Sequence, residues 1–163
     1  GTNRNYLLVH GDKEVTEEQE QVYFEVIKKR ASRIPLQHIT GVQNFMGLDF
    51  KVNEHVLIPR QDTEILVEEV LRQMSDGSRI LDMCTGSGCI LTSLLHYNNW
   101  CEGVGVDVSP DALEVAKYNA SNLLKDKEQT SFQFVESNLF ENVVSYTDSI
   151  KNRRPFYVCP CIR

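Results

Sequence analysis

Apolar and polar residues alternate with two different periods in the C-terminal half of the chain. Short apolar runs predict strands, and longer segments with apolar residues three or four positions apart predict helices. The strands are expected near 79–83, 102–107 and 131–136, and the helices near 88–97, 110–124 and 139–150. Strands separated by helices predict a parallel sheet with right-handed crossovers.

The N-terminal part of the chain has a different pattern. Residues 14–33 predict one helix, with Thr16 as N-cap, acidic residues in the first turns and basic residues in the last. From 37 to 58 apolar residues recur with period two, which predicts a β-hairpin or a small meander. A helix capped by Asp62 or Thr63 is then expected to run to about Met74, with Ile65, Leu66, Val70 and Leu71 facing inward.

The most informative stretch runs from Ile80 to Ile90, where an apolar run ends, a glycine turn follows and a helical pattern begins. A strand, a glycine turn and a helix form the first unit of a nucleotide-binding α/β fold. No Lys follows Gly88, which argues against a Walker loop, and a third glycine of the dinucleotide pattern is missing. Asp82 would repel a pyrophosphate and favour a cation. The pattern therefore favours S-adenosylmethionine, which carries a sulfonium and an ammonium group.

A second acid supports this interpretation. Asp107 ends the next predicted strand, 19 residues after Gly88 (107 − 88). Folds of this type place there the acid that binds the ribose hydroxyls. The alternative is that Gly86 and Gly88 only turn the chain and that Asp107 only caps the helix after it.

Composition and charge narrow the function. The chain has 163 residues and a net charge of −6, so a broad nucleic-acid-binding surface is not expected. It contains no apolar run of the roughly 20 residues that cross a membrane, and its first residues are polar, so a cytoplasmic protein is expected. Cys159 and Cys161 have no second ligand pair nearby, so no metal site is predicted.

Three segments resemble the release-factor glutamine methyltransferases, which methylate a glutamine side-chain amide in class I peptide chain release factors. They are Ile34-Pro35-Leu36-Gln37-His38-Ile39-Thr40-Gly41 with Phe45 to Phe50, Leu57-Ile58-Pro59-Arg60 with Thr63-Glu64, and the core from Ile80 to Ile90 with Asp107. The second is the most specific, because generic methyltransferases lack it. The resemblance implies a Rossmann-like α/β methyltransferase fold with an incomplete parallel sheet, preceded by a helix and a β-hairpin.

The resemblance also implies a division of the chain and a set of partners. Residues 1–36 would be a remnant of an N-terminal helical domain that binds release factors. Residues 37–58 would be a hairpin linker, and 59–163 a methyltransferase domain truncated at its C-terminus. Class I release factors are the expected partner, with neither a membrane nor direct nucleic-acid contact.

The family's cofactor residues can be carried over one by one. Its glycine loop corresponds to Cys84, Thr85, Gly86, Ser87 and Gly88, with Cys84 in place of the first glycine. Asp107 corresponds to the ribose acid. Asn138 and Leu139, after Ser137, correspond to residues near the adenine, and the amide oxygen of Asn138 can accept from the adenine amino group. Asp82 completes the expected pocket.

The tail departs from the family, whose Asn-Pro-Pro-Tyr tetrapeptide should follow the fourth strand. Here residues 155–163 contain Pro160 and Ile162 but neither the Asn nor the Tyr. No catalytic residue is assigned, and the chain is expected to be a fragment without transfer activity. Two alternatives stay open: an amino-methyltransferase acting on nucleic acid, and a non-catalytic cofactor-binding module.

Overall fold

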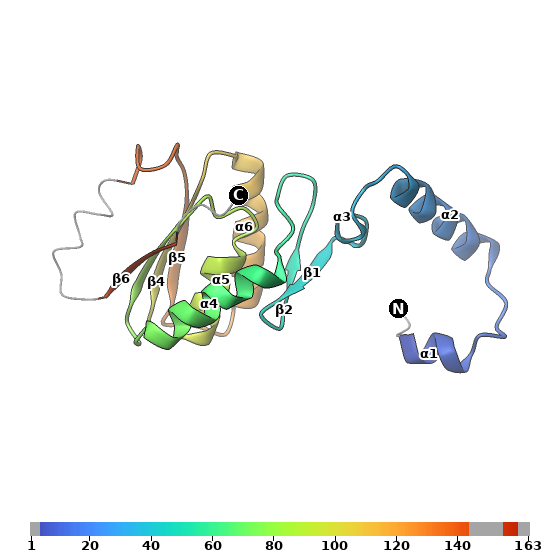
Figure 1. Cartoon of the computed structure of the whole chain (residues 1–163), viewed down its shortest axis with the longest axis horizontal. Helices are drawn as coiled ribbons and strands as arrows, with labels where there is room; N and C mark the ends of the chain where they lie inside the picture. The colour runs from blue at the N-terminus through green and yellow to red at the C-terminus, as the bar shows by residue number, and fades with distance from the viewer. Residues whose placement is uncertain (1–3, 144–154, 160–163) are drawn as a thin grey trace.

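The computed structural model describes residues 4–143 and 155–159. In these residues four parallel strands form one sheet in the order β5-β4-β3-β6 (Figure 1). The strands are β3 (Arg79–Met83), β4 (Glu102–Asp107), β5 (Ser131–Glu136) and β6 (Phe156–Cys159). The first three confirm the predicted ranges, and β6 is an addition that the periodicity did not predict.

Helices α5 (Cys89–Tyr97) and α6 (Pro110–Leu123) connect β3 to β4 and β4 to β5, and they confirm the predicted helices. Together with α4 (Gln61–Gln73), they lie on one face of the sheet (Figure 1). Apolar residues at helical spacing are buried on α5 and α6: Leu91, Leu94, Leu95, Leu113, Val115, Ala116 and Ala120. Ser109 caps α6 by accepting the Ala112 N–H, with Pro110 at the first helical position.

The position of β3 in the sheet defines where a ligand can bind. β3 pairs with β4 on one side and with β6 on the other. In that register Asp82 lies opposite Gly105 and Cys159. The chain runs from β3 outward to β5 and returns to the other side at β6, which makes the C-terminal end of β3 a topological switch point. Open α/β sheets bind ligands at such points.

The predicted hairpin consists of β1 (Val42–Phe45) and β2 (Leu48–Lys51), preceded by a short helix α3 (Leu36–Thr40) that the period-two pattern did not predict. Met46 and Gly47 form the turn, and both have positive φ (51° and 74°), as a type I′ hairpin turn requires. Phe45 and Phe50 are fully buried in the main core. The hairpin therefore packs on the α/β part of the chain.

Helix α4 differs from its predicted details. It begins after Arg60, which caps it without a side-chain hydrogen bond, so the predicted capping by Asp62 or Thr63 is wrong. Val67 is fully buried, with Val70, Leu71 and Met74 packed against the core. This stripe at positions 67, 70, 71 and 74 leaves Ile65 on the outer side, 67% exposed. The inward position predicted for Ile65 is therefore wrong.

The N-terminal residues form α1 (Arg4–Val9) and α2 (Glu17–Ala31), which extend away from the sheet (Figure 1). Thr16 caps α2, as predicted, and it forms a capping box with Gln19. No residue of α2 is buried. The helix predicted at 139–150 is not seen in its described part, because residues 139–143 form turns; the rest lies outside the described residues.

Candidate functional site

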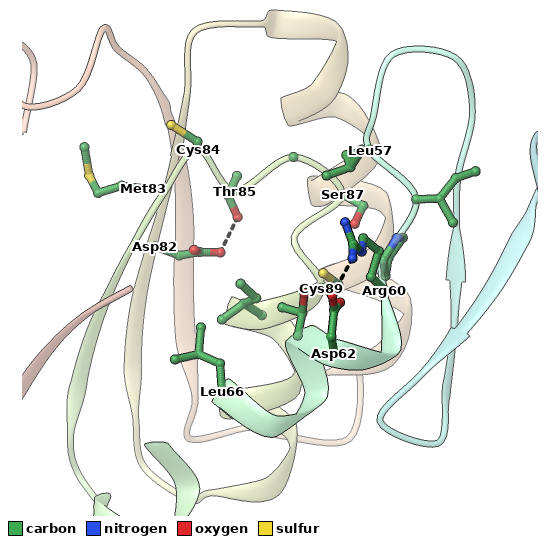
Figure 2. A pocket seen from close by; sticks show the side chains of 15 residues that line it. Leu57, Arg60, Asp62, Leu66, Asp82, Met83, Cys84, Thr85, Ser87 and Cys89 are labelled. Atoms are coloured by element: carbon green, nitrogen blue, oxygen red, sulfur yellow. Dashed lines mark hydrogen bonds and ion pairs between the residues drawn. The ribbon is translucent and has the colours of Figure 1, made fainter. Parts of the chain in front are cut away.

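A cavity of about 380 Å³ opens at the C-terminal end of β3 (Figure 2). One wall is the end of β3, the glycine loop and the start of α5, and the other is the segment before α4 with the first turns of that helix. The lining residues are Leu57, Ile58, Pro59, Arg60, Asp62, Thr63, Leu66, Asp82, Met83, Cys84, Thr85, Gly86, Ser87, Cys89 and Ile90. Its volume is in the range of small-molecule sites.

The glycine loop is held tightly against the sheet and α6. Thr85 N–H donates to the Val106 carbonyl and Gly88 N–H to the Thr85 carbonyl, each at 2.8 Å. Gly88 has φ 74°, and a Cβ there would come within 3.1 Å of the Ala116 Cβ. A side chain at this position would therefore be strained and crowded, so the loop requires the glycine.

Asp82 places a carboxylate in the cavity wall, although its side chain is only 1% exposed. The Thr85 hydroxyl donates to its Oδ2 at 2.7 Å (Figure 2). Burial raises the pKa of Asp82 to about 6, with Asp107 contributing a smaller rise. The group is thus mostly ionised at neutral pH, and a buried negative charge favours a cation beside it. This fits the sulfonium or ammonium group of S-adenosylmethionine.

Asp107 has two backbone partners. Its Oδ2 accepts the Gly86 N–H at 2.9 Å, and its Oδ1 accepts the Ser109 N–H at 3.0 Å. The carboxylate thus supports both the glycine loop and the start of α6. Each oxygen can accept a second hydrogen bond, so ribose binding remains compatible with this geometry. Asp107 is outside the cavity lining, and its ribose role stays a prediction.

The predicted adenine residues follow β5, next to β4. Ser137 N–H donates to the Asp107 carbonyl at 3.0 Å, which brings this segment to the end of β4. Asn138 donates its Nδ2 to Glu141 at 2.9 Å, and this leaves its amide oxygen available as an acceptor. Leu139 is 53% exposed. These two residues and Gly88 are outside the cavity lining, so the adenine contacts also stay predictions.

The structure adds a wall that the site prediction missed. Arg60 and Asp62, an ion pair at 2.5 Å, flank the cavity (Figure 2), and Thr63 is a further lining residue. Glu64, the residue after Thr63, accepts the Met46 N–H at 2.6 Å and so holds the hairpin turn. The Leu-Ile-Pro-Arg segment of the resemblance was the sequence signal for this wall.

The cysteines around the cavity differ in state. Cys89 lines it as a free thiol, and burial raises its pKa to about 12. Burial also raises the pKa of Cys159, opposite Asp82 in the sheet, to about 12. Cys84 is disulfide-bonded and has φ 57°, a left-handed conformation that suits the glycine it replaces. The buried thiols are therefore poor nucleophiles.

Residues 4–143 and 155–159 contain neither a cluster of metal ligands nor a helix suited to a membrane. Among them no group of three or more His, Cys, Asp or Glu side chains could hold a metal ion. No helix formed by these residues is long and apolar enough to cross a membrane. The described tail ends at Cys159, so the position expected for the catalytic tetrapeptide lies outside the described residues.

Comparisons with known proteins identify two domain families and a set of relatives. Residues 1–41 match the PrmC N-terminal domain, and residues 60–158 match the methyltransferase small domain. The release factor glutamine methyltransferase of Clostridium acetobutylicum is 41% identical over 128 residues, covering 77% of this chain and 45% of that protein. The protein of the same name from Borreliella burgdorferi is 33% identical over 157 residues, which cover 95% of this chain and 54% of that protein.

Among solved structures, a SAM-dependent methyltransferase from Geobacter sulfurreducens with S-adenosyl-L-homocysteine has a TM-score of 0.39 and 25% identity. The match covers 51% of this chain and 31% of the Geobacter sulfurreducens chain. The chain spans about half the length of the curated relatives it matches. The methyltransferase match confirms the expected cofactor class, S-adenosylmethionine. Because residues 1–41 and 60–158 match these two domain models, and its relatives share one name, the chain belongs to the release factor glutamine methyltransferase family.

Proposed function

We propose that the protein transfers a methyl group from S-adenosylmethionine to a glutamine side-chain amide in class I peptide chain release factors. The observation that carries this proposal is the buried Asp82 carboxylate at the glycine loop, in a chain whose relatives are named for that reaction. Release factors act on ribosomes, so we propose a cytoplasmic site of action. The catalytic residues are expected beyond the described strand β6.

In this proposal the cofactor supplies an electrophilic methyl group, and the described residues bind and orient it. Asp82 attracts the positive charge, and the loop from Cys84 to Gly88 fits closely around the ligand. Asp107 binds the ribose, while Asn138 and Leu139 contact the adenine. An amide nitrogen is a weak nucleophile because its lone pair is delocalised. Proximity and orientation must therefore supply much of the rate.

The test is methyl incorporation into a purified release factor by a full-length protein that carries this chain and an intact Asn-Pro-Pro-Tyr. The matched substrate has its target glutamine replaced by alanine. We expect incorporation into the first substrate and none into the second. The 163-residue chain should bind S-adenosylhomocysteine but transfer nothing. Incorporation into RNA or DNA, without glutamine-dependent labelling of the release factor, would contradict the proposed substrate.

A further inference from the structure

Asn119 is a polar residue on the buried face of α6. Its neighbours Ala116 and Ala120 are fully buried, and Asn119 itself is 2% exposed. Burying a side-chain amide costs free energy unless its donors and its acceptor form hydrogen bonds. The side chain makes three hydrogen bonds, to two segments that are far apart in the sequence.

The first segment is the end of the hairpin. Lys51 N–H donates to Asn119 Oδ1 at 2.8 Å, and Asn119 Nδ2 donates to the Lys51 carbonyl at 3.0 Å. Lys51 pairs with Val42 at the open end of the β1–β2 ladder. Alternate residues of an antiparallel strand direct both backbone groups away from the partner strand. Asn119 thus bonds to the outward-facing N–H and carbonyl of Lys51 in β2, as a residue of a neighbouring strand would.

The second segment is the glycine loop. The Nδ2 of Asn119 also donates to the Ser87 carbonyl, at 2.9 Å. The other side of the same peptide is held too, because Gly88 N–H donates to the Thr85 carbonyl at 2.8 Å. Ser87 lines the cavity and is 2% exposed. The orientation of a cavity-lining peptide therefore depends on Asn119.

We infer that Asn119 is a positioning residue that couples the hairpin to the cofactor loop. With the hairpin in place, Asn119 is held by Lys51 and presents its second N–H to Ser87, which favours the loop conformation that binds cofactor. By thermodynamic linkage, bound cofactor favours the docked hairpin to the same degree. The inference rests on the proposed function, since it assumes that the loop binds S-adenosylmethionine.

The contact at the other end of the hairpin does not provide this link. Glu64 and Tyr97 hold Met46 at the turn, through its N–H and its carbonyl respectively. Neither of these bonds involves the glycine loop. The bonds from α4 and α5 therefore fix the turn, whereas Asn119 joins the open end of the hairpin to the loop.

The first experiment is calorimetric titration of the 163-residue chain with S-adenosylhomocysteine. Asn119→Asp keeps the size and the acceptor for Lys51 N–H but, when ionised, has no N–H for the Ser87 and Lys51 carbonyls. The matched control is Asn122→Asp, because Asn122 is exposed on the same helix and donates to the Tyr118 carbonyl of its own helix, at 2.8 Å. We expect about tenfold weaker binding for Asn119→Asp and an unchanged affinity for Asn122→Asp.

The second experiment measures hydrogen exchange of the Lys51 amide in the wild-type chain, with and without S-adenosylhomocysteine. Coupling predicts slower exchange at Lys51 when the ligand is bound, with no change at Glu20 in α2, whose N–H donates to Thr16. This measurement decides the question even if the Asn119 variant does not fold. Unchanged Lys51 exchange, or unchanged affinity in a folded Asn119→Asp chain, overturns the inference alone. Absence of binding by the wild-type chain overturns the proposed function and the inference with it.

Discussion

The Oδ2 atom of Asp107 accepts the backbone N–H of Gly86 at 2.9 Å. This bond joins the end of β4 to the loop that follows β3, and the same carboxylate accepts the Ser109 N–H at the start of α6. Asp107 thus supports the loop through its own backbone contacts. Its predicted ribose contacts must be separated from this support by experiment.

Replacing Asp107 with Ala should lower the affinity for S-adenosylhomocysteine at least about tenfold, because ribose hydrogen bonds to a carboxylate are worth roughly 1.5–3 kcal/mol each. The same change removes two backbone acceptors, so the free energy of unfolding should also fall. Asp107→Asn keeps one acceptor, so it should be more stable than Asp107→Ala. Its affinity for S-adenosylhomocysteine should still fall. Calorimetry and urea unfolding of both variants measure the two effects. Unchanged affinity in both variants would leave Asp107 with only its capping role.

The sequence predicted the sheet well because burial and periodicity agree there. β3 is buried along its whole length, and the glycines at 86 and 88 mark the turn directly. The wall formed by residues 57–66 was not predicted, since segments far apart in the chain meet there only through tertiary packing. Asn119 gave one signal, a lone polar residue on the apolar face of a helix. Its partners Lys51 and Ser87 bond through backbone atoms, which leave no trace in the sequence.

Asp82 should make stability depend on pH. Burial raises its pKa from 3.8 to about 6, so between these values the folded chain holds a proton that the unfolded chain has lost. Stability contributed by this group is therefore greatest at low pH and falls as the pH rises to about 6. The total loss is on the order of 3 kcal/mol.

Asp82→Asn removes this titration and can still accept from Thr85. It should unfold at higher urea than the wild type at about pH 8, with the difference shrinking toward pH 4. Its affinity for the cationic cofactor should fall. Asp126→Asn, at an exposed position, is the control for the change in net charge. A variant less stable than the wild type at pH 8 would show that the ionised carboxylate stabilises the fold.

Cys84 holds a left-handed backbone conformation with φ 57°. A side chain in this conformation is disfavoured by about 1 kcal/mol relative to glycine. We compare Cys84→Gly with Cys84→Ala, because both lack the sulfur that forms the disulfide. The glycine variant should be the more stable by about 1 kcal/mol in urea unfolding, and it should bind S-adenosylhomocysteine at least as well. Greater stability of the alanine variant would mean that packing of the Cβ outweighs the backbone strain.

Met46 has both of its backbone groups held by side chains of the methyltransferase half. Glu64 accepts its N–H at 2.6 Å from α4, and the Tyr97 hydroxyl donates to its carbonyl at 2.5 Å from α5. Glu64→Ala should lower the free energy of unfolding by about 1–2 kcal/mol, because a partly buried N–H loses a charged acceptor. Glu64→Gln keeps an acceptor and should lose less. Glu68→Ala is the control at an exposed position one turn later in α4.

Tyr97→Phe removes the other bond and should cost about 1 kcal/mol. Glu64 and Tyr97 both bond to the backbone of one turn residue, Met46. The double variant Glu64→Ala with Tyr97→Phe should therefore lose less free energy of unfolding than the sum of the two single losses. Once either bond is gone, the turn is freer and the second bond orders less of it. Urea unfolding of the four chains in the cycle measures the coupling. Additive losses would mean that Met46 is held by the buried Phe45 and Phe50 regardless of these two hydrogen bonds.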